Sequence, residues 1–436
     1  MKVHPNAQRT AMSPSAYVAF VAFAVLCLKF VLLLSLESGI WINGDGSLRL
    51  SEISNMTRFG LTVPGVNAAT AGYATVVHIV GVAIGTTSLW PIALIQSVFL
   101  SIAVWFLAVS LMRTRLAWAG VPFAYIALLN PPLSLSSLAL SSDSVTAGLL
   151  MVALGHLIRD LATPRDVRTP RRILTAAAVL SLAALMSPML AFGSVAFLLA
   201  WAAARGNREQ AIWISAGALA LLLALPLMLL VRNQMANNSS MLATSSEQMA
   251  PVVSGFAGLD STRCGIGTLD VVSLNVPKFR CLMAWYQESS SNATEAAVPN
   301  AVSFWSPWVG PMSGIDLRDN PWPALHPAAV LGDPGNPDSI VNSPLATLVS
   351  WMWLLFALFG MLLGLGALRG LGEVESEISV AAGWLIFGSW LASTLTHADA
   401  STRLPVMGMV ILLQVVGWRF LFTRGRETSR DPFAPQ

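Results

Sequence analysis

The residue best placed to do chemistry is Asp45, which lies between Gly44 and Gly46 directly after the first long apolar stretch. Because glycine has no side chain, the backbone or a ligand can come close to this carboxylate. An ionised carboxylate at a membrane surface can take a proton from a hydroxyl group or help to hold a cation. Aspartate is also a favoured N-cap, so a simpler interpretation is that Asp45 caps the following helix, a role that is compatible with a site.

A second carboxylate, Asp143, follows Ser141 and Ser142 and precedes the apolar stretch 145–163. The same two interpretations apply, since the residue would cap the next helix or act in a site. If Asp45 and Asp143 lie at the same depth, one can act as a base and the other can orient it. Alternatively, the pair can hold a divalent cation such as Mg²⁺ or Mn²⁺.

Arginines are the expected partners of a phosphate group. Arg403 begins a late apolar stretch, where its guanidinium can bind a lipid phosphate or act as an ordinary interfacial cation. Arg49 and Arg58 follow Asp45 and are further candidates for phosphate binding. The remaining candidates for substrate contacts are polar side chains near these positions: Glu52, Tyr73, His78 and His397. A lone histidine is also common as a hydrogen-bonded structural group.

These residues belong to a chain whose composition points to lipid as its main solvent. It has 436 residues, of which 55% are hydrophobic and 11% are charged. Soluble domains contain roughly 25% charged residues. Apolar stretches long enough to cross a membrane predict an all-α bundle of about ten spans: 15–36, 89–112, 116–133, 145–163, 173–188, 189–204, 211–231, 345–368, 378–396 and 404–422.

The eleventh apolar stretch, 73–85, is too short to cross and is predicted to be a juxtamembrane or re-entrant helix. Basic residues in short loops set the orientation, with Lys2 and Arg9 in the cytoplasm. Counting 73–85 as a span would move Arg113 and Arg115 outside and break this pattern. We therefore expect three outer segments, 37–88, 131–144 and 232–344.

The expected organisation has three parts. Residues 1–231 form an N-terminal transmembrane catalytic module, 232–344 an extracytoplasmic loop or cap, and 345–436 the last transmembrane helices with a cytoplasmic tail. Cys264 and Cys281 both fall in the outer loop, where an oxidising compartment favours a disulfide bond. There is no CxxC motif, so a structural zinc site is not expected.

The segment after Asp45 predicts an amphipathic interfacial helix. Its apolar face contains Leu50, Ile53, Met56 and Phe59, and its polar face contains Arg49, Glu52 and Asn55.

Lys29 lies inside the first apolar stretch, about seven residues from its outer end. A buried charge costs several kcal/mol unless it snorkels or finds a partner, and we expect the simpler outcome, an amine that snorkels towards the membrane surface.

The order of these features resembles the GT-C class of integral-membrane glycosyltransferases, which includes protein O-mannosyltransferase-like and aminoarabinose-transferase-like enzymes. The resemblance rests on the Gly-Asp-Gly segment at Asp45, the Leu-Ser-Ser-Asp-Ser segment at Asp143, and the Arg-Leu-Pro segment at Arg403. It covers about residues 10–200, and 395–422 more loosely. The first outer loop has one aspartate instead of a paired acidic motif, and of a Tyr-Pro-Pro run only Tyr73 is present.

This resemblance implies an enzyme that takes a sugar from a polyprenyl-phosphate donor at the outer face of a bacterial cytoplasmic membrane. It implies that Asp45 is the catalytic aspartate, Asp143 the second acidic residue, and Arg403 a contact of the donor phosphate. The acceptor would be a glycan, a lipid or a protein of the cell envelope. Membrane lipids are expected partners, and nucleic acid is not.

Two other functions remain open. An O-antigen ligase or polymerase-like enzyme would use basic residues of the large outer loop, which contains Arg263, Lys278, Arg280, Arg318 and His326. A non-enzymatic transporter of lipids or glycans is the second alternative. It is disfavoured because the acidic residues lie at the outer ends of the spans and not at mid-membrane.

Overall fold

The structure of the protein is a computed structural model. It describes residues 13–35, 40, 44–61, 72–85, 88–164, 167–187, 189–204, 208–237, 301–302, 304–305, 348, 351–395 and 401–427. For residues 44–48 the backbone is described and the side chains are not. Most of the expected outer loop 232–344, with the expected disulfide bond between Cys264 and Cys281, lies outside the described residues.

All the secondary-structure elements of the described residues are helices, as the all-α prediction requires. The α-helices are α1 (Pro14–Leu34), α2 (Gly44–Phe59), α3 (Gly72–Ile84), α4 (Trp90–Leu111), α5 (Gly120–Leu129), α6 (Pro131–Leu135), α7 (Asp143–Leu161), α8 (Arg171–Met186), α9 (Leu190–Ala204), α10 (Arg208–Asn237), α15 (Phe359–Leu371), α16 (Glu373–Leu395) and α17 (Met407–Glu427). Short 3₁₀ segments are η1 (Ala117–Ala119), η2 (Ser136–Leu138) and η6 (Ser401–Val406), and η5 (Trp353–Leu358) is a π-helix.

Several of these helices are suited to a membrane. Within the described residues, five are long and apolar enough to cross one: α1, α4, α7, α10 and the helix over Thr402–Thr423. A sixth span results if the segments Ala117–Leu129 and Pro131–Leu138, bent by 64° against each other, are taken together. Each of the ten expected apolar stretches contains a helix. Helix α10 continues to Asn237, beyond its expected end at 231.

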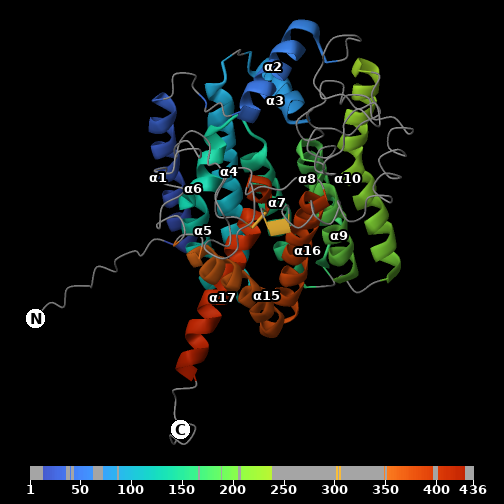
Figure 1. Ribbon diagram of the computed structural model, residues 1–436. Helices are drawn as coiled ribbons and strands as arrows, with labels where there is room; N and C mark the ends of the chain where they lie inside the picture. The colour runs from blue at the N-terminus through green and yellow to red at the C-terminus, as the bar shows by residue number, and fades with distance from the viewer. Residues whose placement is uncertain are drawn as a thin grey trace, which may run out of the picture.

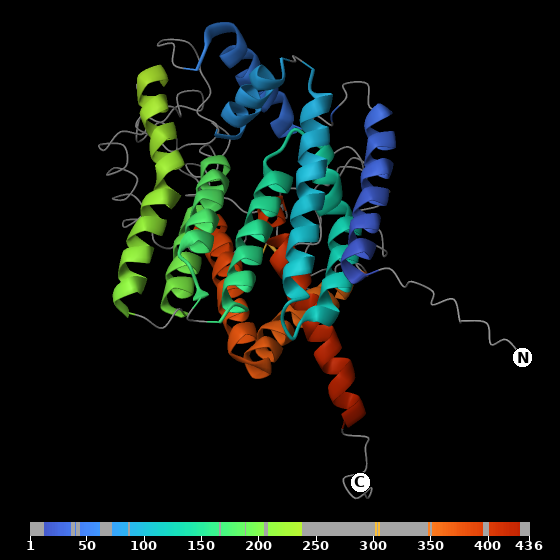
Figure 2. The same cartoon turned by 180° about the vertical axis from the view of Figure 1, so that it is seen from behind.

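The long helices stand side by side in a bundle, and α2 and α3 lie across one of its ends (Figures 1 and 2). This end is called the α2–α3 end here. Helix α1 begins, and α17 ends, at the opposite end of the bundle (Figure 1). The α3 helix has 13 residues and is too short to count among the candidate spans, as are Leu190–Ala204 and Leu355–Leu371. Its juxtamembrane or re-entrant placement stays a prediction.

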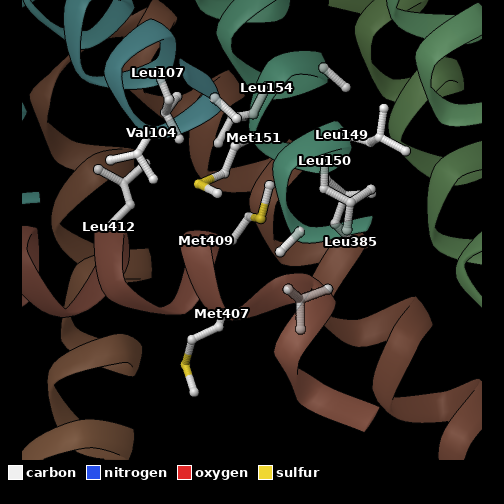
Figure 3. Close-up of a cluster of buried hydrophobic side chains, with 14 of the residues drawn as sticks. Val104, Leu107, Leu149, Leu150, Met151, Leu154, Leu385, Met407, Met409 and Leu412 are labelled. Atoms are coloured by element: carbon white, nitrogen blue, oxygen red, sulfur yellow. The ribbon is translucent and has the colours of Figure 1, made fainter. Parts of the chain in front are cut away.

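The core lies where α4, α7, α16 and α17 meet. Figure 3 shows buried aliphatic and methionine side chains from these four helices: Val104, Leu107, Leu149, Leu150, Met151, Leu154, Leu385, Met407, Met409 and Leu412. Helix α4 packs against α1 and α7, α7 packs against α8, and η6 packs against α7. Helices inside a membrane protein are held together by close packing. This cluster therefore fixes α4 and α7, which contain polar residues near the α2–α3 end.

The structure shows which side of α2 is buried against the protein. The helix forms as expected, but its buried face contains Arg49, Glu52 and Met56, while Leu50 and Phe59 are exposed. The buried positions recur at intervals of three and four residues, which places them on one side of a helix. The charged side chains can be buried there because Arg49 lies over the ring of Tyr73 and Glu52 lies near Arg232.

For Lys29 the structure shows the alternative to snorkelling, a buried partner. Its side chain is only 3% exposed, and Nζ donates a hydrogen bond of 2.9 Å to the Ser137 hydroxyl oxygen. The hydroxyl groups of Ser137 and Ser97 are 2.9 Å apart. The chain between α5 and α7 breaks into short helices inside the bundle, and this break places a serine hydroxyl where the amine can reach it. The Lys29 amine is therefore stabilised by a buried hydrogen-bonding partner and does not extend to the membrane surface.

Candidate functional site

Tyr73 is the centre of a polar cluster at the α2–α3 end. It lies in the first turn of α3 and is 1% exposed. Its hydroxyl donates a hydrogen bond of 2.6 Å to Oε1 of Gln96 in α4. The amide nitrogen of Gln96 donates in turn to the backbone oxygens of Ser137 and Ala139, at 3.3 and 3.0 Å. One buried glutamine thus connects α3 with the segment that leads to Asp143.

A glycine allows α3 to take this position. A Cβ atom on Gly72 would lie 1.8 Å from the backbone oxygen of Leu185 at the end of α8. No side chain can be placed at such a distance, so the two backbones approach each other only because residue 72 is glycine. The close contact fixes the start of α3, and with it the depth at which Tyr73 enters the bundle.

Asp143 is the first residue of α7, and the structure corrects its expected role as the N-cap. Ser142 occupies the cap position, and the carboxylate of Asp143 accepts a hydrogen bond of 2.6 Å from the Ser141 hydroxyl. The Asp143 backbone N–H donates to the same hydroxyl oxygen at 3.1 Å. A carboxylate in the first turn is still stabilised by the helix dipole. Asp143 is half-buried and oriented by a neighbouring serine.

Arg49 and Asp143 both act electrostatically on Tyr73. Burial raises the pKa of the Tyr73 phenol, the charge of Asp143 raises it further, and the nearby Arg49 guanidinium and a hydrogen bond with the Ser141 backbone lower it. Burial is the largest effect, so the pKa lies above the usual value and the hydroxyl stays protonated. The structure therefore brings together three of the residues singled out in the sequence, namely Arg49, Tyr73 and Asp143.

Arg49 has the features of an anion-binding residue. Its guanidinium carbon lies 5.2 Å from the centre of the Tyr73 ring, and the residue is 8% exposed. Among the described residues, no group forms a hydrogen bond with its buried Nε atom. A buried cation with an unused N–H group binds an anion more strongly than an exposed one does, because water competes less.

Glu52 and Arg232 form a second charged contact beside this cluster. Both are buried, and the Glu52 carboxylate acts electrostatically on Arg232. Nε of Arg232 also donates a hydrogen bond of 2.8 Å to the backbone oxygen of Leu61. These contacts connect α2 and the residues after it with α10. Arg232 was not a candidate from the sequence, where it is one basic residue at the end of an apolar stretch.

Arg58 and His78 lie around a separate cavity of about 470 Å³ between α2, α3 and the start of α4. It is lined by Leu50, Ile53, Ser54, Thr57, Arg58, Val77, His78, Gly81, Val82, Gly85, Ser88, Leu89 and Ile92. His78 Nδ1 is 3.3 Å from the Thr57 hydroxyl oxygen. Tyr73 and Arg49 do not line this cavity. Helix α2 therefore has the charged cluster on one face and the cavity on another.

Arg403 lies on η6 and is 3% exposed. Its Nη1 atom donates a hydrogen bond of 2.6 Å to the Phe304 backbone oxygen, and the guanidinium lies 4.6 Å from the centre of a Trp353 ring. The Trp353 indole N–H donates to the Trp305 backbone oxygen at 2.6 Å. These contacts hold residues 304–305 against η5. The expected role of Arg403 in phosphate binding stays a prediction.

Two sequence candidates fall outside this description. The backbone of Asp45 is in the first turn of α2, whereas its side chain lies outside the described parts of the chain. His397 lies outside the described residues altogether. Among the side chains that are described, no three histidine, cysteine, aspartate or glutamate residues come together as metal ligands. These donors alone do not form a divalent cation site of the usual kind.

Gln96 and Ser141 are functional candidates that the sequence interpretation missed. Gln96 could have been found, because an amide in the middle of an apolar membrane stretch requires a hydrogen-bonding partner. Ser141 could not have been distinguished from the other serines of its segment. Its position beside both the Asp143 carboxylate and Tyr73 depends on how α3 and α7 pack.

Comparison with protein-family models finds no match, and neither does comparison with curated proteins. Among solved structures, the chain is similar to the archaeal oligosaccharyltransferase AglB from Archaeoglobus fulgidus, in a complex with an inhibitory peptide and a dolichol-phosphate. The two chains are 14% identical, with a TM-score of 0.46. The similarity covers 96% of this chain and 53% of AglB, so this chain spans about half the length of that protein.

Proposed function

We propose that the protein is an integral-membrane glycosyltransferase of the GT-C type. It transfers a sugar from a polyprenyl-phosphate donor to a cell-envelope acceptor at the α2–α3 end. The observation that carries this proposal is the cluster of Arg49, Tyr73 and Asp143. In it, a buried cation whose Nε bonds to none of the described residues lies near an oriented carboxylate. Such a cluster at the end of a membrane bundle suits a substrate that has both a phosphate and hydroxyl groups.

The reaction needs few protein groups. A carboxylate accepts the proton of the acceptor hydroxyl. At the same time the oxygen of this hydroxyl forms a bond with the anomeric carbon of the sugar. The bond between that carbon and the phosphate oxygen breaks, and polyprenyl phosphate leaves with the electron pair. The phosphate is already a good leaving group, so the protein must mainly remove one proton, stabilise the negative charge and exclude water.

Each residue has a distinct role in this scheme. Asp45 is the base, and Asp143, held by Ser141, orients the acceptor. Arg49 binds the phosphate, with Arg58 and Arg403 as further contacts of the donor. Tyr73, kept neutral by burial, donates its hydrogen bond to Gln96 and holds α3 in place. Glu52 and Arg232 fix α2 against α10, while His78 and His397 contact the substrate.

The topology belongs to the same proposal. The bundle has about ten spans, with the start of α1 and the end of α17 in the cytoplasm of a bacterial cell. The α2–α3 end faces the exterior or periplasm. Residues 1–231 form the catalytic module, 232–344 the outer loop with the Cys264–Cys281 disulfide bond, and 345–436 the final helices and tail. The support is the placement of α2 and α3 opposite the start of α1 (Figure 1).

The test uses the full chain in lipid nanodiscs with a panel of radiolabelled undecaprenyl-phosphate sugars and a cell-envelope fraction as acceptor. We expect wild type to release undecaprenyl phosphate and to label the acceptor with at least one donor. If none of the donors is consumed faster than in empty nanodiscs, the proposal is wrong. In proteoliposomes, movement of intact donor across the bilayer without cleavage would identify a transporter instead.

A further inference from the structure

A second cavity lies towards the other end of the bundle, between η1 and α5 on one side and η5 and α17 on the other. Its volume is about 500 Å³, within the range of about 300–1,000 Å³ that is typical of small-molecule sites. It is lined by Trp118, Pro122, Ile126, Phe356, Ala357, Gln414, Val415, Trp418 and Arg419. We call it the α5–α17 groove. None of its lining residues belongs to α2, α3 or the cluster around Tyr73.

Close backbone packing joins α17, which forms one wall of this groove, to α15. A Cβ atom on Gly417 would lie 2.0 Å from the Gly360 backbone oxygen, and one on Gly364 would lie 2.0 Å from the Leu413 backbone oxygen. Helices α15 and α17 are therefore in direct backbone contact, as glycine-rich membrane helices are when they pack tightly. The groove is part of the fold and does not depend on a movable loop.

The π-helix η5 forms another part of the wall, and its carbonyl groups are satisfied by α17. Trp418 Nε1 donates to the Phe356 backbone oxygen at 2.9 Å, and Gln414 Nε2 donates to the Ala357 backbone oxygen at 3.2 Å. The amide nitrogen of Gln414 and the indole nitrogen of Trp418 thus donate within the wall, and the groove is mainly apolar. A π-helix inside a membrane helix is uncommon and frequently marks a functional site.

Arg419 supplies a cation at this apolar groove. Its guanidinium carbon lies 4.1 Å from the centre of the Trp118 ring, and the residue is exposed. Stacking on a ring uses the flat face of the guanidinium and leaves its N–H groups, which lie along the edge, for an anion. Tryptophan and arginine together are the side chains expected at the headgroup level of a bilayer.

We propose that the α5–α17 groove binds an anionic glycerophospholipid from the leaflet at the end of the bundle where α1 begins. The phosphate binds Arg419 beside Trp118, and an acyl chain lies along Ile126, Phe356 and Val415. Charge complementarity selects this occupant, because one cation at an otherwise apolar groove matches a lipid with one anionic headgroup. Ile126 and Phe356 are exposed on the surface of the bundle, where acyl chains have access. The site is independent of the proposed glycosyl transfer.

The test is native mass spectrometry of the full chain, delipidated in detergent and titrated separately with phosphatidylglycerol and with phosphatidylcholine. Wild type is expected to bind one phosphatidylglycerol more tightly than phosphatidylcholine. Arg419→Gln should weaken the binding of phosphatidylglycerol about fivefold, the factor that corresponds to about 1 kcal/mol for one cation near an anionic lipid. Arg369→Gln is the matched control, because Arg369 is exposed in the last turn of α15 and does not line the groove.

A second pair of variants tests the groove without changing charge. Ala357→Phe fills the groove and should abolish binding of the single lipid, whereas Leu355→Phe, at an exposed position of the same π-helix, should not. Equal losses in Arg419→Gln and Arg369→Gln would show only a general effect of surface charge and would overturn the proposal. Equally tight binding of the two lipids would also overturn it. If Ala357→Phe does not fold, the two arginine variants decide alone.

Discussion

The hydroxyl of Tyr73 lies 2.6 Å from Oε1 of Gln96, and this hydrogen bond joins α3, which lies across the end of the bundle, to α4 within it. Gln96 also donates to Ser137 and Ala139, the residues shortly before Asp143. A change at either partner is therefore expected to act on both the α2–α3 end and the start of α7.

Asp45→Asn is expected to reduce the initial rate of glycosyl transfer by about 10²–10⁴-fold, the usual loss for a general base. Asparagine keeps the size of the side chain and is tolerated in the first turn of a helix, so the protein should fold normally. Asp143→Asn should reduce the rate less, because its proposed role is to orient the acceptor. Equal losses together with inhibition by a chelator would indicate a shared cation. If the Asp45→Asn variant folds and transfers sugar at the wild-type rate, Asp45 is not the base.

Arg49→Gln is expected to raise the KM for the polyprenyl-phosphate donor by roughly 10–100-fold, since a hydrogen bond to a charged group contributes about 1.5–3 kcal/mol. Arg49→Lys should recover part of this loss, because it keeps the charge but not the planar donor geometry. Arg58→Gln, which changes a proposed further contact of the donor on the other face of α2, should raise this KM less than Arg49→Gln does. Steady-state kinetics over a range of donor concentrations gives the comparison. If Arg58→Gln has the larger effect, the phosphate binds in the cavity around His78 instead.

Tyr73→Phe is expected to change the alkaline dependence of stability. The pKa of Tyr73 is raised in the folded protein, whereas an unfolded tyrosine has a pKa of about 10. Below about pH 10 the hydroxyl is protonated in both states, and above it only the unfolded state loses the proton. Wild type should therefore lose stability more steeply than Tyr73→Phe as the pH rises above 10. Parallel thermal-unfolding curves from pH 8 to 11 would contradict this.

The contact between Lys29 and Ser137 predicts unequal effects of the two single variants. Ser137→Ala leaves the buried amine of Lys29 without its partner and should cost about 1–3 kcal/mol of stability. Lys29→Met removes the amine itself and should cost little, because the Ser137 hydroxyl keeps its bond to the Ser134 backbone oxygen. The double variant should therefore be more stable than Ser137→Ala. Thermal unfolding in detergent of wild type, the two single variants and the double variant measures the coupling between the two side chains. If the loss of stability in the double variant equals the sum of the two single losses, the residues are not coupled.

Gly72→Ala is expected to displace α3 from α8, because the added Cβ would lie 1.8 Å from the Leu185 backbone oxygen. The displacement should weaken the bond between Tyr73 and Gln96 and reduce both stability and transfer. Gly366→Ala is the control, since a Cβ there meets no atom within 4 Å and alanine favours a helix by roughly 0.5–1 kcal/mol. Thermal unfolding and transfer assays on both variants provide the test. Equal behaviour of the two would show that the close approach at Gly72 has no consequence.

The sequence by itself determined which segments are helices. Each expected stretch contains one, because length and apolarity are local properties. The separation of 73–85 from the spans stays a prediction. It also identified Arg49, Tyr73 and Asp143 one by one as polar residues near the ends of apolar stretches. Gln96 is likewise a polar residue, inside an apolar stretch, but it was not among the candidates from the sequence.

Only the tertiary structure decided how the charged and polar groups are paired. It placed Arg49 and Glu52 on the buried face of α2, where Tyr73 and Arg232 are their neighbours. It also placed the Lys29 amine against Ser137, 108 positions along the chain. Periodicity alone assigns charged residues to the polar, exposed face, since burial of a charge is unfavourable without a partner. The partners come from distant segments, so their effect on burial becomes visible only when the helices are packed together.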